Sequence, residues 1–283
     1  MNILLLGATG YLGCNIAKKL CDSGHNITCV IRISSDTSIL ETLPVDYISN
    51  DLDSIELYLR HNPVDWIING VCSYNSNKSL YADLLVSNTI FPLNVLNLAI
   101  KYGVKGFLTM GTSLPNDFNL YSFSKHELSR FGRFLSFNDG IKFIDLQLEM
   151  FYGGFHEPNN RFISSVKQKL LNNDDIMLTE GFQKRDIIRV EDITEIVYKL
   201  LVTNYGNGFM ALPVGTGESH SIREIVKFMK KEMKSSSNLL FGAIPSRKSE
   251  PDTLAHIDWY KDIDFKLKYT YFDGLKDMCE NKY

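Results

Sequence analysis

A phenol and an ammonium lie four residues apart in the segment Tyr121-Ser-Phe-Ser-Lys125. If the segment is helical, this spacing puts both side chains on one face, one turn apart. A nearby ammonium favours the phenolate, so the tyrosine could exchange a proton with a sugar hydroxyl or a ketone near neutral pH. The pair alone is a weak pattern, because it occurs by chance on helix surfaces. Its meaning depends on the elements around it.

A hydroxyl group precedes this pair in the segment Met110-Gly-Thr-Ser113. The segment follows an apolar run and is expected at the carboxyl edge of a parallel sheet, where open α/β folds bind ligands. Thr112 would donate a hydrogen bond to a reacting oxygen there, and Ser113 offers a second hydroxyl. Thr112, Tyr121 and Lys125 are therefore the catalytic candidates.

A glycine motif, Gly7-Ala-Thr-Gly10-Tyr-Leu-Gly13, joins the first apolar run to a helical segment. Gly7 permits a tight turn, Gly10 lets backbone amides approach a pyrophosphate, and Gly13 allows the helix to pack closely on the strand. The helix N-terminus adds a partial positive charge. The motif therefore predicts a dinucleotide site. Its contacts are expected from Gly7, Thr9, Gly10, Tyr11, Leu12 and Gly13.

The residue after the second strand helps to select between NAD and NADP. NAD-selective folds carry an acidic residue there for the ribose 2′-hydroxyl, whereas this chain has Arg32, followed by Ser34 and Ser35. A guanidinium suits a 2′-phosphate, so the sequence predicts NADP(H). An arginine on a solvated loop is the alternative interpretation. Asp51 and Leu52, after the next short strand, are expected to flank the adenine.

Short apolar runs alternate with amphipathic stretches over the first half of the chain. The runs predict buried strands at Ile3–Leu6, Ile27–Ile31, Trp66–Asn69, Gly106–Met110 and Phe143–Leu148. The best helical segments are Tyr11–Ser23, Leu84–Lys101 and Ser122–Phe137. This repeated βα rhythm predicts an α/β fold, a doubly wound parallel sheet of the Rossmann type with helices on both faces.

The rhythm changes after about Gly153, which predicts a smaller C-terminal substrate-binding lobe. Ile187–Arg189 and Phe209–Pro213 are expected to return to the sheet, and Ser221 and Glu224 match a capping box that opens a helix. We therefore expect a dinucleotide-binding domain at 1–153 plus 187–213. The lobe would comprise 154–186 plus 214–283.

The composition favours an ordinary globular enzyme. The formal net charge is -3 and hydrophobic residues make up 44%, so nothing in the overall balance favours nucleic acid or an anionic membrane. The five cysteines form no CxxC pair, which argues against a zinc site or a disulfide framework. With an N-terminal apolar run too short for a signal peptide, we expect a cytoplasmic protein without a metal ion.

Taken together, the motifs identify the chain as a member of the extended short-chain dehydrogenase/reductases, the NAD-dependent epimerase/dehydratase family that acts on nucleotide sugars. The resemblance rests on GATGYLG, GTS, YSFSK, FYGG and the stretch Arg185-Asp-Ile-Ile-Arg-Val-Glu-Asp192. It implies that Thr112 matches the catalytic Ser/Thr and that Tyr121 matches the acid/base. It also implies that Lys125 binds the nicotinamide ribose and lowers the tyrosine pKa.

The resemblance extends to the substrate. It implies a cofactor-site role for Asn88, contacts of Arg185 and Arg247 with the substrate diphosphate, and a nucleobase covered by Phe162. Both arginines could instead be partners in surface salt bridges, and an aromatic residue on a helix more often belongs to the core.

Relatives pair through the two long helices that correspond to Leu84–Lys101 and Ser122–Phe137, so a homodimer is implied as well.

Three departures from the family pattern narrow the reaction. Tyr121 follows Thr112 by only nine positions, Met150 replaces an asparagine before the Tyr-Gly pair, and Ser113-Leu114 stands where dehydratases carry Asp-Glu. Dehydration is therefore disfavoured. Within the family, the segments GTSLP, LYSFSK, LEMFYGGF and LTEGFQKRD look most similar to those of CDP-paratose and CDP-abequose synthases.

This similarity implies an oxidoreductase that reduces the 4-keto group of a CDP-activated deoxyhexose with NADPH, for lipopolysaccharide or another surface polysaccharide. Arg32 agrees, since a reductase must release its NADP after each turnover. An NAD-dependent 4-epimerase that retains its cofactor, and a non-catalytic NADP-sensing protein, are the alternatives.

Overall fold

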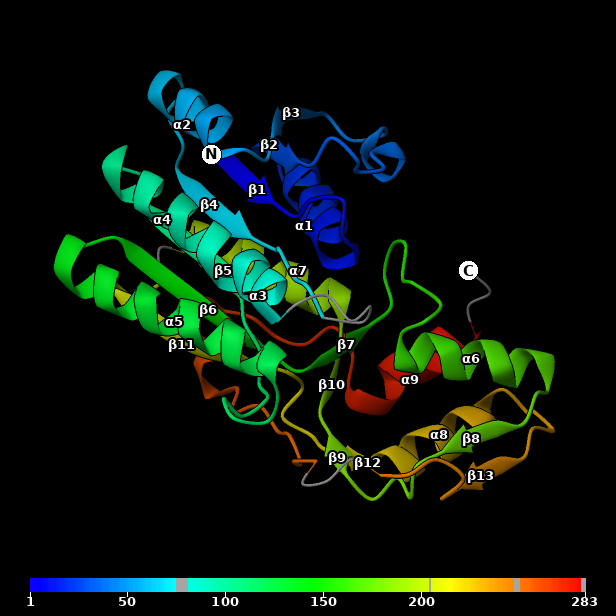
Figure 1. Ribbon diagram of the computed structural model, residues 1–283. Helices are drawn as coiled ribbons and strands as arrows, with labels where there is room; N and C mark the ends of the chain where they lie inside the picture. Colours follow the sequence, from blue (N-terminus) through cyan, green and yellow to red (C-terminus); the bar gives the residue numbers. More distant parts are fainter. Residues whose placement is uncertain (75–80, 204, 247–249, 281–283) are drawn as a thin grey trace. The chain divides into compact units, whose positions relative to one another are not determined.

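A seven-stranded parallel sheet forms the centre of the computed structural model, which describes residues 1–74, 81–203, 205–246 and 250–280 (Figure 1). Its strand order is β11-β6-β5-β4-β1-β2-β3. The strands are β1 (Asn2–Leu6), β2 (Asn26–Ile31), β3 (Val45–Ser49), β4 (Trp66–Asn69), β5 (Gly106–Met110), β6 (Lys142–Leu148) and β11 (Phe209–Val214). The sequence-based expectation of a doubly wound α/β fold is confirmed.

Helices cover both faces of this sheet. They are α1 (Tyr11–Asp22), α2 (Leu52–His61), α3 (Tyr81–Leu85), the π-helical turn η2 (Val86–Ile90), α4 (Phe91–Lys101), α5 (Leu120–Asp139) and α7 (Val190–Val202), with a short 3₁₀ turn η1 (Ser38–Leu40) before β3. Figure 1 shows α2, α4 and α5 on one face and α1 with α7 on the other. Fully buried strand residues such as Leu4, Ile67 and Phe107 pack with Leu96 of α4 and Leu128 of α5. Burial from both faces explains why the strands are almost continuously apolar.

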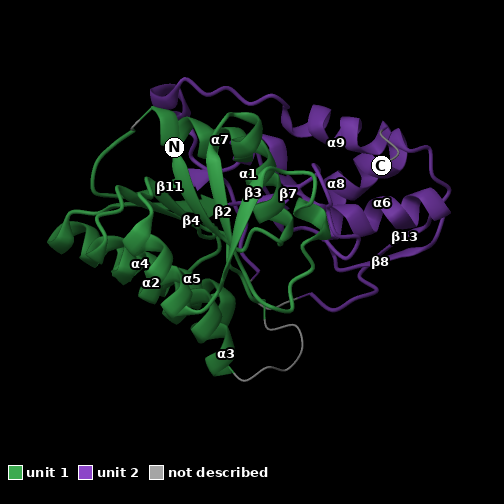
Figure 2. Cartoon of the chain, turned by 90° about the horizontal axis from the view of Figure 1, so that it is seen from above, with its two compact units in different colours: residues 1–147, 194–212 green, residues 148–193, 213–283 purple. Residues whose placement is uncertain are grey.

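The chain divides into two compact units, which Figure 2 shows in different colours. Unit 1 comprises residues 1–147 and 194–212, and unit 2 comprises residues 148–193 and 213–283. The remaining elements belong to unit 2. They are β7 (Met150–Tyr152), α6 (Phe162–Asn172), β8 (Ile176–Leu178), β9 (Lys184–Arg185), β10 (Ile187–Arg189), β12 (His220–Ser221), α8 (Ile222–Glu232), β13 (Leu239–Phe241), the 3₁₀ turn η3 (Asp258–Ile263) and α9 (Tyr271–Glu280).

Unit 2 has its own apolar core and three two-stranded sheets, β10-β7, β12-β9 and β13-β8. The expectation that Ile187–Arg189 returns to the main sheet was wrong, because these residues pair in parallel with Met150–Tyr152. The place beside β6 is taken by β11, so the three-residue strand β10 pairs with the nearest extended segment instead. The predicted capping box at Ser221 and Glu224 is confirmed at the start of α8.

A second capping box sets the start of α5. The backbone N–H of Ser122 donates to the Asn119 side chain at 2.8 Å, and the N–H of Asn119 donates to the Ser122 hydroxyl at 3.2 Å. These bonds satisfy amide groups that a helix N-terminus leaves unpaired. The helix therefore begins at Leu120, before the Ser122 expected from the sequence, and both Tyr121 and Lys125 lie in its first two turns.

The segment Tyr81–Lys101 is long and apolar enough, by composition alone, to cross a membrane. Its buried residues include Leu84, Val95 and Leu96, and it packs beside α5 and α2 in unit 1. The core helix of a soluble protein passes the same test of length and composition.

Candidate active site

The glycine motif forms a tight turn between β1 and α1. Gly7 has a positive φ of 76°, and the Gly10 N–H donates to the Gly7 carbonyl at 3.1 Å. A Cβ on Gly13 would lie 2.1 Å from the Gly7 carbonyl oxygen, so only glycine allows α1 to approach the turn this closely. No side chain caps α1, and its first turn contains no acidic residue. Its first amide groups can therefore bind an anion, and the turn fits a dinucleotide pyrophosphate.

Substituting Gly13→Ala should abolish this fit. The added methyl group must displace backbone, and overpacking of this kind costs about 1–3 kcal/mol. A cost of this size in the turn that holds the pyrophosphate would weaken dinucleotide binding by about 5- to 150-fold. Isothermal titration with NADPH measures the loss. The control is Gly24→Ala at the other end of α1, where a Cβ would have no neighbour within 4 Å. Equal NADPH affinity in the two variants would contradict the role of Gly13.

The residues expected at the adenosine end lie near the carboxyl ends of neighbouring strands. Arg32 is exposed directly after β2, which pairs with β1. Asp51 is the N-cap of α2, and its carboxylate accepts hydrogen bonds from the N–H and the hydroxyl of Ser54. Bonds to Ser49 and Ser54 lower the pKa of Asp51 to about 2. Leu52, the first residue of α2, is exposed.

The three catalytic candidates come together in unit 1. Thr112 follows β5 and is buried, and its hydroxyl lowers the pKa of the neighbouring Tyr121 phenol. Ser113, the next residue, is partly buried. The Thr112 oxygen also accepts the N–H of Leu114 at 3.3 Å, which leaves its proton for donation. The sheet edge and the start of α5 therefore present two hydroxyl groups side by side.

Lys125 is buried one turn after Tyr121, and its ammonium has defined partners. It donates to the carbonyl oxygens of Val71 at 2.9 Å and Met110 at 3.0 Å. An ammonium has three donors, so one remains for a ligand. The fixed lysine ties the loop after β4 to the end of β5.

Burial raises the pKa of the Tyr121 phenol well above its usual value, and Cys72 and Tyr74 raise it further, whereas Thr112 lowers it. The phenol is therefore protonated at neutral pH. This is the state that a proton donor needs.

Gly111, the residue before Thr112, packs closely against Asp145. Asp145 lies on β6, accepts the Ser129 hydroxyl at 2.7 Å, and has a pKa raised by burial. A Cβ on Gly111 would lie 2.0 Å from its other carboxyl oxygen. Only glycine therefore fits at the position that precedes Thr112.

Asn88 holds a loop in the structure. It is fully buried in η2, accepts the Ser73 N–H at 2.7 Å and donates to the Ser73 carbonyl at 2.9 Å. A third bond joins its amide to the Ser124 hydroxyl on α5 at 3.0 Å. Asn88 thus positions the loop after β4, which Lys125 also contacts.

That loop contains two residues that no sequence motif indicated, Cys72 and Tyr74. Both raise the pKa of Tyr121, and the Tyr74 ring stacks on the Tyr121 ring. One available signal was their place directly after β4, at the carboxyl edge of a parallel sheet, where ligands bind.

Two of the predicted substrate residues, Phe162 and Arg185, lie in unit 2. Arg185 is buried and forms an ion pair with Glu250, and it also donates to the carbonyl groups of Lys184 and Pro251. Phe162 begins α6 and packs, partly buried, against the core of unit 2. Arg247 lies outside the described residues.

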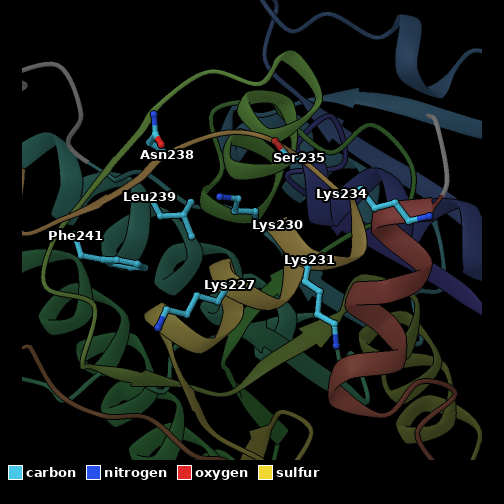
Figure 3. A pocket seen from close by; sticks show the side chains of 8 residues that line it. All are labelled: Lys227, Lys230, Lys231, Lys234, Ser235, Asn238, Leu239 and Phe241. Carbon is cyan, nitrogen blue, oxygen red and sulfur yellow. The ribbon is translucent and has the colours of Figure 1, made fainter.

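Unit 2 also has a shallow basic hollow, formed by α8 and the chain up to β13. Figure 3 shows Lys227, Lys230 and Lys231 projecting from α8 around it. It contains none of the residues predicted for the site. Among the described parts of the chain, no group of three or more His, Cys, Asp or Glu side chains could hold a metal ion.

Comparison with known proteins gives the family. The profile of the NAD dependent epimerase/dehydratase family matches residues 3–208. A CDP-abequose synthase of Salmonella muenchen is 25% identical over 288 residues, covering 99% of this chain and 97% of that protein. The structure of a UDP-glucose 4-epimerase with UDP-glucose from Thermotoga maritima has a TM-score of 0.88 at 19% identity and covers 99% of this chain and 98% of its own.

A UDP-glucuronic acid 4-epimerase from Bacillus cereus, in complex with UDP-glucuronic acid and NAD, has a TM-score of 0.86 at 18% identity, with 99% of both chains covered. At this identity the solved structures show a common fold.

Proposed function

Since the chain belongs to the NAD-dependent epimerase/dehydratase family, we propose that it is an NADPH-dependent 4-ketoreductase acting on a nucleotide-activated deoxyhexose. The observation that carries the proposal is the pair of hydroxyl groups at Thr112 and Tyr121, with a protonated phenol beside a buried lysine. Such a pair can bind and protonate one carbonyl oxygen. The similarity to a CDP-abequose synthase over 99% of this chain supports CDP as the nucleotide. A role in lipopolysaccharide synthesis is part of the proposal.

In the proposed reduction, a few residues of this chain each have one role. When bound, the dinucleotide supplies the hydride. Tyr121 donates a proton to the oxygen of the ketone, and Thr112 donates a hydrogen bond that stabilises the negative charge developing there. The remaining N–H of Lys125 binds the nicotinamide ribose, and the turn at Gly7–Gly13 binds the pyrophosphate. In this chain Ser113-Leu114 replaces the Asp-Glu pair of dehydratases, which favours reduction over loss of water.

Unit 2 would hold the nucleotide part of the substrate. We assign the diphosphate to Arg185 and Arg247 and the base to Phe162. Because Arg185 is paired with Glu250, diphosphate binding would have to replace that carboxylate. The substrate and the cofactor are both water-soluble, which fits a cytoplasmic enzyme.

The direct test follows NADPH absorbance with a panel of 4-keto-6-deoxy sugars activated by CDP, dTDP or GDP. We expect oxidation with a CDP sugar, at a rate well above those for the other two nucleotides. Faster NADPH oxidation with a dTDP or GDP sugar would show that the proposed nucleobase is wrong, while the proposed ketone reduction would remain valid. An absence of oxidation with every 4-keto sugar would contradict the reductase.

Cofactor choice should depend on Arg32. In the unmodified protein we expect tighter binding of NADPH than of NADH. Arg32→Asp replaces an attraction to the 2′-phosphate by a repulsion, which should shift the preference towards NADH by about 1–3 kcal/mol, or about 5- to 150-fold. Fluorescence titration of both nucleotides measures the shift, with Arg60→Asp on α2 as the control. Equal affinities in the unmodified protein would refute the prediction.

We also propose a homodimer formed through α5 and the neighbouring helical segment. Phe123, Phe131 and Phe134 are exposed along one side of α5, and Val86 and Ile90 of η2 are exposed as well. An exposed apolar set of this size is typical of an interface. The Val86–Ile90 turn and α5 are in contact within unit 1.

Phe134→Glu should therefore convert the protein into a monomer at micromolar concentration, because it would bury a carboxylate in an apolar interface. Sedimentation velocity measures the mass. Phe182→Glu in unit 2 is the matched control, since Phe134 and Phe182 are 65% and 68% exposed. A monomeric unmodified protein, or a dimeric Phe134→Glu variant, would contradict the interface.

A further inference from the structure

A second phenol contacts Tyr121. The rings of Tyr74 and Tyr121 are stacked with their centroids 4.8 Å apart and an interplanar angle of 29°. Tyr74 also raises the pKa of the Tyr121 phenol, so the two groups interact electrostatically. Tyr121 thus has two hydroxyl neighbours, Thr112 from the end of β5 and Tyr74 from the loop after β4.

The loop that carries Tyr74 is held by buried side chains. Asn88 binds both backbone groups of Ser73, and Lys125 binds the carbonyl of Val71. The N–H of Val71 donates in addition to the Asn69 side chain at 3.2 Å. Polar groups fixed in this way are set before any ligand binds. The contact between the two phenols therefore follows from the architecture of unit 1.

The two partners of Tyr121 differ in their access to water. Thr112 is 5% exposed, whereas Tyr74 is 58% exposed. Lys125 is also buried, and carbonyl groups take two of its N–H donors. Tyr74 therefore links the reacting phenol to solvent, and a reductase, unlike an epimerase, takes up one proton from solvent in each turnover.

We propose that Tyr74 relays a proton from solvent to Tyr121 after each reduction. The inference rests on the proposed ketone reduction. Tyr121 gives its hydroxyl proton to the oxygen of the reduced substrate and is left as a phenolate. The phenolate takes the hydroxyl proton of Tyr74, and Tyr74 takes a proton from water or from a buffer acid. One proton enters for each ketone reduced, and both phenols return to their starting state.

The test separates the first turnover from the later ones. Tyr74→Phe keeps the stacked ring and removes the hydroxyl, so the first turnover in stopped flow should keep the rate of the unmodified enzyme. Steady-state turnover should then fall by about tenfold or more, because Tyr121 regains its proton slowly. Small buffer acids such as imidazolium should restore the rate in proportion to their concentration, and the unmodified enzyme should not respond.

Two control variants sharpen this experiment. Tyr47→Phe removes another exposed phenol of unit 1, from β3, and should leave the steady-state rate unchanged. Cys72→Ala removes the exposed thiol of the same loop and should show no rescue by buffer. A purely structural role of Tyr74 would slow the first and later turnovers alike, without buffer rescue.

A second measurement needs neither cofactor nor substrate. Because Tyr74 raises the pKa of Tyr121, Tyr74→Phe should lower it. NMR of protein labelled at tyrosine Cζ follows the titration, with the Tyr121 signal assigned through Tyr121→Phe. The other groups facing this phenol are the Cys72 thiol and the Thr112 hydroxyl, with Lys125 one turn along α5. All three groups remain in Tyr74→Phe, so a change in the Tyr121 pKa would report the loss of the Tyr74 hydroxyl.

The outcomes distinguish the two proposals. The unmodified enzyme could reduce a keto sugar while Tyr74→Phe shows the same steady-state rate and no burst. The relay through Tyr74 would then be wrong, and the proposed ketone reduction would remain valid. An unchanged Tyr121 pKa in Tyr74→Phe would also overturn the relay. If the unmodified protein reduces no keto sugar, both proposals fail, and a lowered Tyr121 pKa would then show only that the two phenols interact.

Discussion

Tyr121→Phe should reduce ketone turnover by about 100- to 10,000-fold, the usual contribution of a positioned general acid. The variant loses only the hydroxyl that would protonate the carbonyl oxygen. Its ring still stacks on Tyr74, where the ring centroids are 4.8 Å apart, so the fold should persist. NADPH affinity should also persist, because the glycine turn is untouched. Single-turnover absorbance measures the chemical step, and titration calorimetry measures cofactor binding.

A Tyr121→Phe protein that reduced the ketone at nearly the normal single-turnover rate would refute the role of this phenol. Tyr121 would then be only an aromatic residue at the start of a helix. A collapse of both turnover and NADPH binding would point to a damaged fold instead, and circular dichroism would detect it.

Lys125→Ala should damage both chemistry and cofactor binding. It removes the ammonium that would bind the nicotinamide ribose, and it leaves the carbonyl groups of Val71 and Met110 without their donor. We expect turnover to fall by about 100-fold or more and the NADPH dissociation constant to rise by about tenfold. Steady-state kinetics and fluorescence titration measure the two effects.

Lys142→Ala is the matched control for the loss of a buried lysine. Lys142 is buried at the start of β6, the opposite end of the strand from the sheet edge that carries the site. Its removal should change stability while leaving NADPH affinity near normal. Equal losses of turnover and affinity in the two variants would mean that Lys125 has only a structural role.

The sequence predicted the parts of the fold that depend on local pattern. The apolar runs at Ile3–Leu6 and Trp66–Asn69 are central strands because helices cover both faces of the sheet. The glycine turn was predictable for a similar reason, since Gly7 needs a positive φ and Gly13 a close helix contact. Both requirements are properties of a few adjacent residues.

Pairing between distant segments was harder to predict. Ile187–Arg189 has the composition of a strand, yet it pairs with Met150–Tyr152 in unit 2. The composition of a three-residue strand does not specify its partner, because the choice depends on which edges other strands already occupy. The start of α5 was also misplaced, because an asparagine cap at Asn119 is a weaker sequence signal than the apolar pattern that follows it.

The same limit applies to the site. The spacing of Tyr121 and Lys125 along one helix was visible, whereas the contact of Tyr74 with Tyr121 requires the loop after β4 to lie beside α5. That contact depends on Asn88, whose side chain bonds Ser73 and Ser124 at once. The family resemblance gave Asn88 a place at the cofactor site, and its three hydrogen bonds show that it also orients the loop.

The central claim is net reduction of a sugar ketone, and isotope transfer tests it most directly. The protein would be incubated with a CDP-4-keto-6-deoxy sugar and NADPH deuterated at C4 of the nicotinamide, and the product analysed by NMR and mass spectrometry. We expect one deuterium on C4 of the hexose and one NADP⁺ formed for each alcohol. A C4-epimerised sugar formed from the alcohol substrate without net NADPH consumption or deuterium would contradict this claim and identify an epimerase.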